Sequence, residues 1–107
     1  MNKILLCNAF SLNMLMSLTS TIQTEELTVP QTVEALREGF VSGMGHSTDL
    51  VSSILGMDIP MNRVSNKIDN GESVIVAQYV GPRLPEGAVE LPEGATLKFI
   101  RVTVTYG

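Results

Sequence analysis

The sequence predicts an α/β fold: a single small domain with a mixed central sheet of about five strands, flanked by helices. Three observations lead to this prediction. The chain has 107 residues, 44% of them hydrophobic, which is typical of one compact core. Short apolar runs of strand length alternate with segments of helical periodicity. Gly, Pro and Asn cluster between these segments, as in turns. Residues 1–107 are therefore treated as one domain.

Two strands and a short helical piece are expected in the first 27 residues. The apolar run 4–7 is typical of a strand buried on both faces. Residues 8–11, which begin with Asn8 and end with Ser11, then turn the chain into a short helical piece at 12–15. The Thr-rich segment 19–27 alternates in part between apolar and polar residues, which favours a second strand.

Two helices are expected next. Thr28 and Pro30 form a start signal for the first helix. The second helix begins with Ser47 or Thr48 as its N-cap, so His46 is expected at a helix N-terminus. The apolar faces comprise Val33, Leu36 and Phe40 in the first helix and Leu50, Val51, Ile54 and Leu55 in the second, and the stop signals are Gly39 and Gly56.

The remaining strands are expected in the second half of the chain. Residues 62–67 are a weaker strand candidate, and Asn70-Gly71 marks a tight turn after them. Residues 74–80 are apolar apart from Gln78, which is typical of a central strand, so these two segments are expected to form a hairpin. Residues 96–106 close the chain as a further strand.

The segment 81–95 is expected to be a loop that covers a ligand. It contains three prolines and three glycines, which exclude regular structure. The pentapeptide Leu-Pro-Glu-Gly-Ala occurs twice in it, at 84–88 and 91–95, and predicts two similar turns. Only the first copy follows an arginine, Arg83.

Charge and cysteine content exclude several classes of protein. Seven Lys and Arg against eleven Asp and Glu give a net charge of −4, which argues against a DNA-coating protein. With Cys7 and His46 as the single cysteine and histidine, neither a disulfide nor a Cys/His zinc site fits within one chain. Asn8, Ser11 and Asn13 interrupt the N-terminal apolar run, so neither a secretory signal nor a membrane span is expected. We expect a cytoplasmic protein that binds neither DNA nor a membrane.

His46 is the most suggestive candidate for chemistry. Gly43 and Gly45 permit close backbone approach, and the helix that follows offers unpaired N–H groups to an anion. A histidine is suited to protonating a leaving group near neutral pH. The alternative is an exposed histidine that merely precedes a helix.

Further polar residues are candidates for contacts with phosphate. Arg83, with Glu86 after it, lies in the rigid loop and is suited to stabilising charge on a phosphoryl oxygen. The alternative for this pair is an ordinary surface ion pair. Arg63 is either a second phosphate ligand or an exposed charge on an edge strand. Asn8, Ser11 and Asn13 either bind a base or phosphate or satisfy the backbone of their own turn.

Together these residues resemble a known family. The similarity is carried by Asn8-Ala9-Phe10-Ser11 with Asn13, Gly45-His46, Asn62-Arg63-Val64, and Arg83-Leu84-Pro85-Glu86-Gly87. In this order along nearly the whole chain, they resemble the viral anti-CRISPR ring nucleases that act on type III systems.

The resemblance implies a homodimer that binds cyclic tetra-adenylate, the second messenger of type III CRISPR complexes. It implies cleavage of this ring into linear di-adenylates without a metal or other cofactor. His46 is then the catalytic general acid, Arg83 stabilises the transition state, and Glu86 orients one of these two side chains. Asn8, Ser11, Asn13 and Arg63 match ligand-contacting positions of the family, and Gly45 and Ser47 beside His46 are further ligand-binding candidates.

Two features depart from the family pattern. Ser47 follows His46 directly, whereas the family more usually places an acidic residue between the histidine and a Ser-Thr pair. Many members have a helix after the Arg-to-Gly loop, whereas the prolines here predict a shorter, non-helical cover. Besides a ring nuclease, a non-catalytic module that sequesters a cyclic oligonucleotide and a small interaction scaffold remain alternatives.

Overall fold

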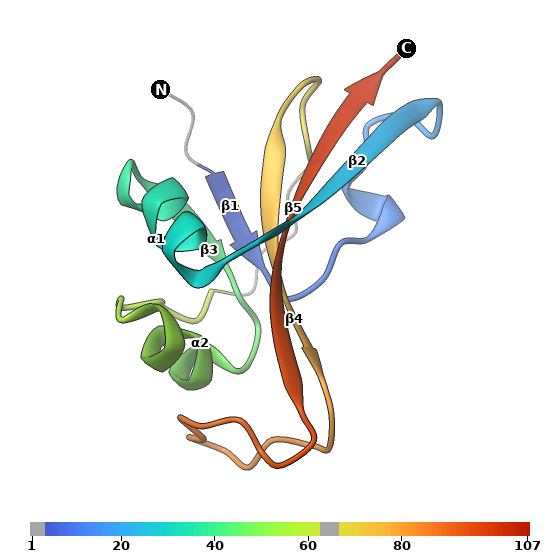
Figure 1. Ribbon diagram of the computed structural model, residues 1–107. Coiled ribbons are helices and arrows are strands. Elements are labelled where there is room, and N and C mark those ends of the chain that lie inside the picture. Colours follow the sequence, from blue (N-terminus) through green and yellow to red (C-terminus); the bar gives the residue numbers. More distant parts are fainter. Residues whose placement is uncertain (1–3, 63–66) are drawn as a thin grey trace.

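A mixed sheet forms the centre of the described part of the protein (Figure 1). The computed structural model describes residues 4–62 and 67–107. The strand order is β2-β5-β4-β1-β3, and the predicted α/β class with a five-stranded mixed sheet is confirmed. The strands are β1 (Ile4–Cys7), β2 (Ser20–Leu27), β3 (Phe40–Gly43), β4 (Ser73–Val80) and β5 (Thr96–Tyr106).

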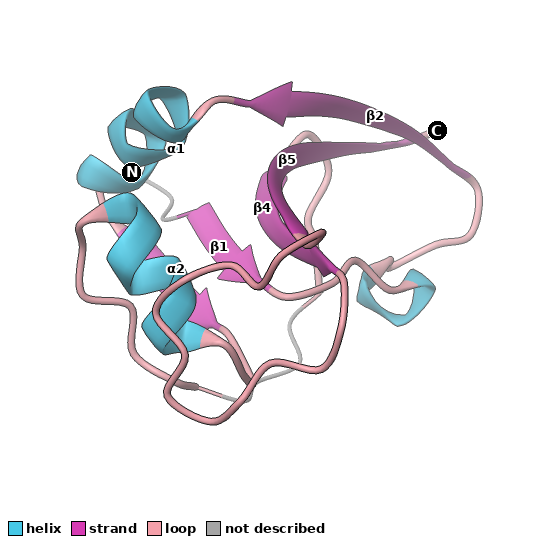
Figure 2. Ribbon diagram, turned by 60° about the horizontal axis from the view of Figure 1, so that its bottom comes forward, coloured by secondary structure: helices cyan, strands magenta, loops and turns pink. Residues whose placement is uncertain are grey.

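The sheet has a parallel half and an antiparallel half. β1 is parallel to both of its neighbours, β3 and β4, so the carboxyl ends of β1 and β3 lie at one edge. β5 is antiparallel to β4 and to β2. The helices α1 (Val29–Arg37) and α2 (Thr48–Leu55) lie side by side over the parallel half, and the antiparallel strands extend beyond them (Figures 1 and 2).

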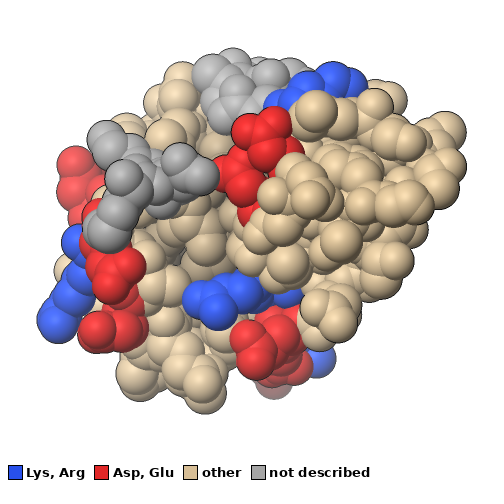
Figure 3. All heavy atoms as spheres, turned by 90° about the horizontal axis from the view of Figure 1, so that it is seen from above, with Lys and Arg blue, Asp and Glu red and all other residues tan. Residues whose placement is uncertain are grey.

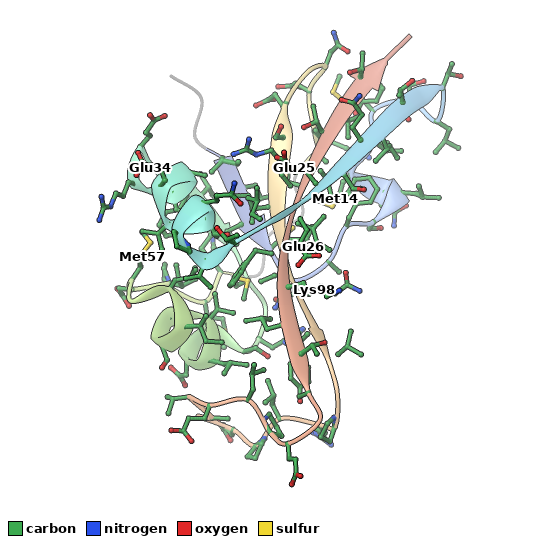
Figure 4. The ribbon with its side chains drawn as sticks, in the orientation of Figure 1. Met14, Glu25, Glu26, Glu34, Met57 and Lys98 are labelled. Atoms are coloured by element: carbon green, nitrogen blue, oxygen red, sulfur yellow. The ribbon has the colours of Figure 1, made fainter. Side chains whose placement is uncertain are left out.

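Apolar side chains pack on both faces of the sheet. On the face that carries the helices, Leu36 and Val51 contact the strands' inward side chains. On the opposite face, a short 3-10 helix η1 (Leu12–Met14) brings Met14, labelled in Figure 4, against the sheet. The helix-side core includes Leu6, Leu27, Met44, Leu55, Ile75 and Phe99, and the opposite core includes Leu15, Ile68, Val74, Val76, Val102 and Val104.

The start of α1 is the one that the sequence predicts. The Thr28 hydroxyl accepts a hydrogen bond from the backbone N–H of Gln31, whose side chain in turn accepts from the Thr28 N–H. This reciprocal pair satisfies two N–H groups that a helix start otherwise leaves open. Pro30 stands in the first turn, where its missing N–H does no harm.

The end of α1 differs from the prediction. Phe40 continues the helical spacing in the sequence, but α1 ends at Arg37 and Phe40 begins β3. Gly39 has φ 120°, which reverses the chain between helix and strand. β3 has only four residues and two of them are Ser42 and Gly43, so no apolar run marks it as a strand. Its pairing with β1 is a tertiary interaction that local periodicity does not report.

The predicted hairpin across Asn70-Gly71 is wrong for the described residues. The turn itself is present, with Gly71 at φ 78° and a hydrogen bond from the Glu72 N–H to the Asp69 carbonyl. β4, however, pairs with β5 and β1. Most of the strand candidate 62–67, including Arg63, lies outside the described residues.

The described surface mixes both signs of charge. Exposed pairs join β2 to β5: Lys98 Nζ lies 3.9 Å from Glu26 Oε1, and Arg101 Nη1 lies 4.0 Å from Glu25 Oε1. Figure 4 labels Glu26 and Lys98 on these neighbouring strands. On the face in Figure 3, blue and red atoms are interspersed, with an uncharged tan area along its right-hand side. Among residues 4–62 and 67–107, no helix is long and apolar enough to cross a membrane.

Candidate functional site

A cleft of about 570 Å³ lies between the start of α2 and the loop that joins β4 to β5. Figure 2 shows this loop running alongside α2. His46, Arg83 and Glu86 all line the cleft, so the structure brings the three predicted catalytic residues together. The cleft lies beyond the carboxyl ends of β3 and β4, at the edge of the sheet where ligands usually bind in open α/β folds.

His46 stands exposed at this cleft and contacts its neighbour Ser47. The imidazole Nδ1 lies 2.8 Å from Ser47 Oγ. Ser47 occupies the predicted N-cap position of α2, but its side chain makes no capping hydrogen bond. The hydroxyl is directed to the histidine instead, which fixes the ring and leaves Nε2 as the nitrogen available to a ligand.

Ser47 also has an unusual backbone conformation. With φ 61° and ψ 22°, it is the one non-glycine residue among those described that has a positive φ. Such a conformation costs roughly 1 kcal/mol in an L-residue. Strain of this kind is concentrated at functional sites, where the surrounding structure holds it.

Asn8 holds the backbone on which His46 stands. Its Oδ1 accepts hydrogen bonds from the N–H groups of Gly45 at 2.7 Å and His46 at 3.3 Å. Its Nδ2 donates to the His46 carbonyl at 3.1 Å. Asn8 directly follows β1 and residues 44–46 directly follow β3, so the parallel pairing of these strands creates the contact. The structure therefore assigns Asn8 a scaffolding contact, and its ligand contact stays a prediction.

A second hollow, of about 510 Å³, lies on the sheet face away from the helices. Its wall is largely apolar and includes Phe10 at the turn after β1. It shares His46 and Tyr79 with the cleft, so these two side chains lie between the hollows. Its other lining residues are Asn8, Ala9, Ile22, Thr24, Val76, Ala77, Gln78, Ile100 and Val102.

The other predicted ligand positions are placed differently. Gly45 and Ser47 line the cleft. Ser11 caps η1, since its hydroxyl accepts from the Asn13 N–H at 3.2 Å, and the Asn13 carbonyl accepts from Lys67 Nζ at 2.6 Å. Neither Ser11 nor Asn13 lines either hollow, so their ligand contacts stay predictions.

The repeated pentapeptide folds into two matching turns. The Ala88 N–H donates to the Pro85 carbonyl at 3.2 Å, and in the second copy an equivalent bond of 3.0 Å joins 95 to 92. Gly87 and Gly94 occupy the third position of each turn with φ 78° and 80°, as a type II turn requires. The loop contains no helix, as its prolines predict. Only the first turn lines the cleft, which distinguishes Glu86 from Glu93.

Two further residues bear on the chemistry. Burial raises the pKa of the Cys7 thiol to about 11, so Cys7 is no nucleophile near neutral pH. Tyr79 lines both hollows, and the sequence prediction missed it. Its one signal is its position at the end of a central strand, just before the loop that carries Arg83.

Comparisons with known proteins identify the fold and the family. A solved structure, B116 of Sulfolobus turreted icosahedral virus (STIV), superposes with a TM-score of 0.78 at 27% sequence identity, covering 94% of this chain and 98% of that one. The chain is also 34% identical over 71 residues to "Uncharacterized protein 26" of Sulfolobus islandicus filamentous virus (isolate Iceland/Hveragerdi). That alignment covers 64% of this chain and 59% of the relative's length.

A family profile described as STIV B116-like matches residues 4–101, which is most of the chain. Both relatives named above are viral proteins, so the matches support a viral protein family. The chain belongs to the STIV B116-like family.

Proposed function

We propose that the protein is a metal-independent ring nuclease that binds cyclic tetra-adenylate and cleaves it to linear di-adenylates. In a host cytoplasm, this reaction would disable type III CRISPR signalling. The observation that carries the proposal is the position of His46 between two hollows, one lined by Arg83 and Glu86 and the other largely apolar. In this proposal the hollow lined by Arg83 and Glu86 binds a phosphate of the oligonucleotide, and the apolar hollow binds a base.

The proposed reaction uses a nucleophile that the substrate itself supplies. The ribose 2′-oxygen attacks the adjacent phosphorus, the bond from phosphorus to the 5′-oxygen breaks, and a 2′,3′-cyclic phosphate forms. His46 protonates the departing 5′-oxygen, while the proton of the 2′-hydroxyl passes to solvent. Arg83 stabilises the extra negative charge on the phosphoryl oxygens, and Glu86 orients Arg83 or His46.

Ser47 and Asn8 support the role of His46 in this scheme. The Ser47 hydroxyl engages Nδ1, which leaves Nε2 to face the leaving group. The hydrogen bonds from Asn8 keep the Gly45–His46 backbone in one position, so little reorganisation is needed during the reaction.

We further propose that two copies of the chain hold one ring. The ring has equivalent halves, and a two-fold dimer presents His46 twice, so both cuts can follow one binding event. Leu12, Met16, Leu18 and Ile22 are close in the sequence and expose apolar side chains, Leu18 to 79%, and we propose that they form one apolar surface. Ile22 also lines the hollow beside His46. This apolar surface therefore adjoins the site.

The test incubates purified protein with cyclic tetra-adenylate in excess chelator and resolves the products by liquid chromatography and mass spectrometry. Linear di-adenylates are expected from the wild type and none from His46→Ala, which should still bind the ring. Arg37→Ala, on α1 away from the cleft, is the charge-matched control for Arg83→Ala and should cleave normally. An intact ring that co-elutes with the protein would support sequestration instead, and an intact, unbound ring would refute both nucleotide functions.

A further inference from the structure

The loop that carries Arg83 is closed at its base by a set of tight contacts. Val80 and Thr96 form the last pair of the β4–β5 ladder, and the loop opens directly beyond them. There Gly81 packs against Ala95: a Cβ added to Gly81 would lie 2.6 Å from the Ala95 Cβ and 2.9 Å from its Cα. Atoms do not approach so closely, so the two sides of the loop touch at a point where no side chain fits.

A hydrogen bond from Tyr79 completes this base. The Tyr79 hydroxyl donates to the Pro82 carbonyl at 2.5 Å. The same hydroxyl would lie 3.0 Å from a Cβ at Gly81, so it fills the space beside that glycine. We call Tyr79, Gly81, Pro82 and Ala95 the loop neck.

The loop neck is directly connected to Arg83. Pro82, whose carbonyl Tyr79 holds, precedes Arg83 and has a φ that its ring restricts. On the other side of Arg83, the turn that starts at Pro85 is closed by its own hydrogen bond. Arg83 therefore stands between two fixed points, although its loop has no regular secondary structure.

We propose that Tyr79 is a positioning residue for Arg83: its hydroxyl holds the loop neck closed, so that the guanidinium is preorganised at the cleft. The catalytic part of this inference rests on the proposed function, whereas its structural part rests on the geometry of the loop neck. A guanidinium that is already in place stabilises developing charge better than one that must first be ordered. Tyr79 also lines both hollows, so the side chain that holds the loop neck faces the two sites where a ligand would bind.

The structural consequence is measured without substrate. Trypsin cleaves after Arg83 only when the loop adapts to the protease, so the rate of cut at Arg83–Leu84 reports loop opening. Tyr79→Phe, which removes only the hydroxyl, should raise this rate about 10-fold, the effect of losing one hydrogen bond. Tyr106→Phe removes the other tyrosine hydroxyl, which bonds to Met16 and Ile68 far from the loop, and should leave the rate unchanged. Equal rates in wild type and Tyr79→Phe would overturn the inference.

The catalytic consequence is measured by a double-mutant cycle. Tyr79→Phe should lower kcat for ring cleavage about 10-fold with little change in KM. In the Arg83→Ala background the same substitution should have almost no effect, because the group it positions is gone. Equal effects in both backgrounds would show that Tyr79 acts elsewhere, which overturns the proposal. Gly81→Ala, which forces the loop neck apart, is a second variant expected to reproduce both results.

The two proposals fail in different ways. If wild-type protein leaves the ring intact while Tyr79→Phe still opens the loop to trypsin, the proposed function fails and the role of the loop neck stands. If the wild type cleaves the ring and Tyr79→Phe changes neither readout, the inference alone fails.

Discussion

Ser47 combines backbone strain with a contact to the candidate catalytic histidine. Its positive φ is unfavourable for any residue with a Cβ, and its hydroxyl meets Nδ1 of His46 instead of capping α2. An N-cap residue that makes no capping hydrogen bond and has a strained φ stabilises the fold less than a capping residue in a relaxed conformation would. The geometry is explained if the Ser47 hydroxyl serves the imidazole.

Ser47→Gly should therefore separate stability from activity. Glycine adopts φ 61° without strain, so the free energy of unfolding should rise by up to about 1 kcal/mol. Loss of the hydroxyl should free the imidazole and lower the rate of ring cleavage at least several-fold. Thermal unfolding and a cleavage assay on the same preparation measure both effects. Undiminished cleavage would show that the hydroxyl has no part in orienting His46.

Sequence reasoning at the scale of residues identified side chains that line the cleft, but not the residues that hold them in place. His46, Arg83 and Glu86 were singled out from residue type and from the family resemblance, and all three line one cleft. The contact of Asn8 with the His46 backbone depends on parallel pairing of β1 and β3, and no local signal reveals that pairing. The role proposed for Tyr79 depends also on the close approach of Gly81 to Ala95 across the loop, which the linear sequence does not reveal.

At the scale of elements, the sheet has the predicted number of strands, but one of them, β3, was not predicted. Most of the strand candidate 62–67 lies outside the described residues, so that prediction stays open. Both helices were located, although α1 ends before Phe40, because helical periodicity and helix start signals are local. A four-residue strand held by its neighbours has no such signal.

The repeated turns in the loop supply a matched pair of carboxylates. Glu86 and Glu93 occupy equivalent positions in turns with the same hydrogen bond and the same glycine conformation. Only the turn with Glu86 lines the cleft. Any effect of charge on loop stability should therefore be shared by both, and any effect on catalysis should belong to Glu86.

Glu86→Gln should lower kcat for ring cleavage at least 10-fold, whereas Glu93→Gln should cleave as the wild type does. The reason is that a carboxylate in the cleft can orient Arg83 or His46, and one outside it cannot. Steady-state kinetics on both variants, with thermal unfolding as a check on folding, measures the difference. Equal losses in the two variants would mean that the carboxylates act through the loop's structure alone.

At the scale of the whole molecule, the two halves of the sheet differ in how they are covered. Both helices pack over the parallel half, while the antiparallel half extends the molecule to 42 Å in its longest dimension (Figure 1). The proposed apolar surface of Leu12, Met16, Leu18 and Ile22 extends from η1 through the connecting residues into β2, and residues 8–24 contain no charged side chain. An exposed apolar surface without charge is typical of a contact with another protein.

If this surface joins two copies, Met16→Glu with Leu18→Glu should convert the dimer to a monomer, because both carboxylates would be desolvated in the contact. Light scattering after size exclusion measures the mass, and circular dichroism checks that the variant is folded. Val89→Glu adds a charge at an exposed apolar residue of the loop, outside this surface, and should leave the mass at that of the wild type. The monomeric variant should also lose ring cleavage, since one chain presents one His46 to a ring with two equivalent halves. A wild type that is monomeric while it cleaves the ring would contradict the proposed dimer, and the ring would then have to turn over within a single chain.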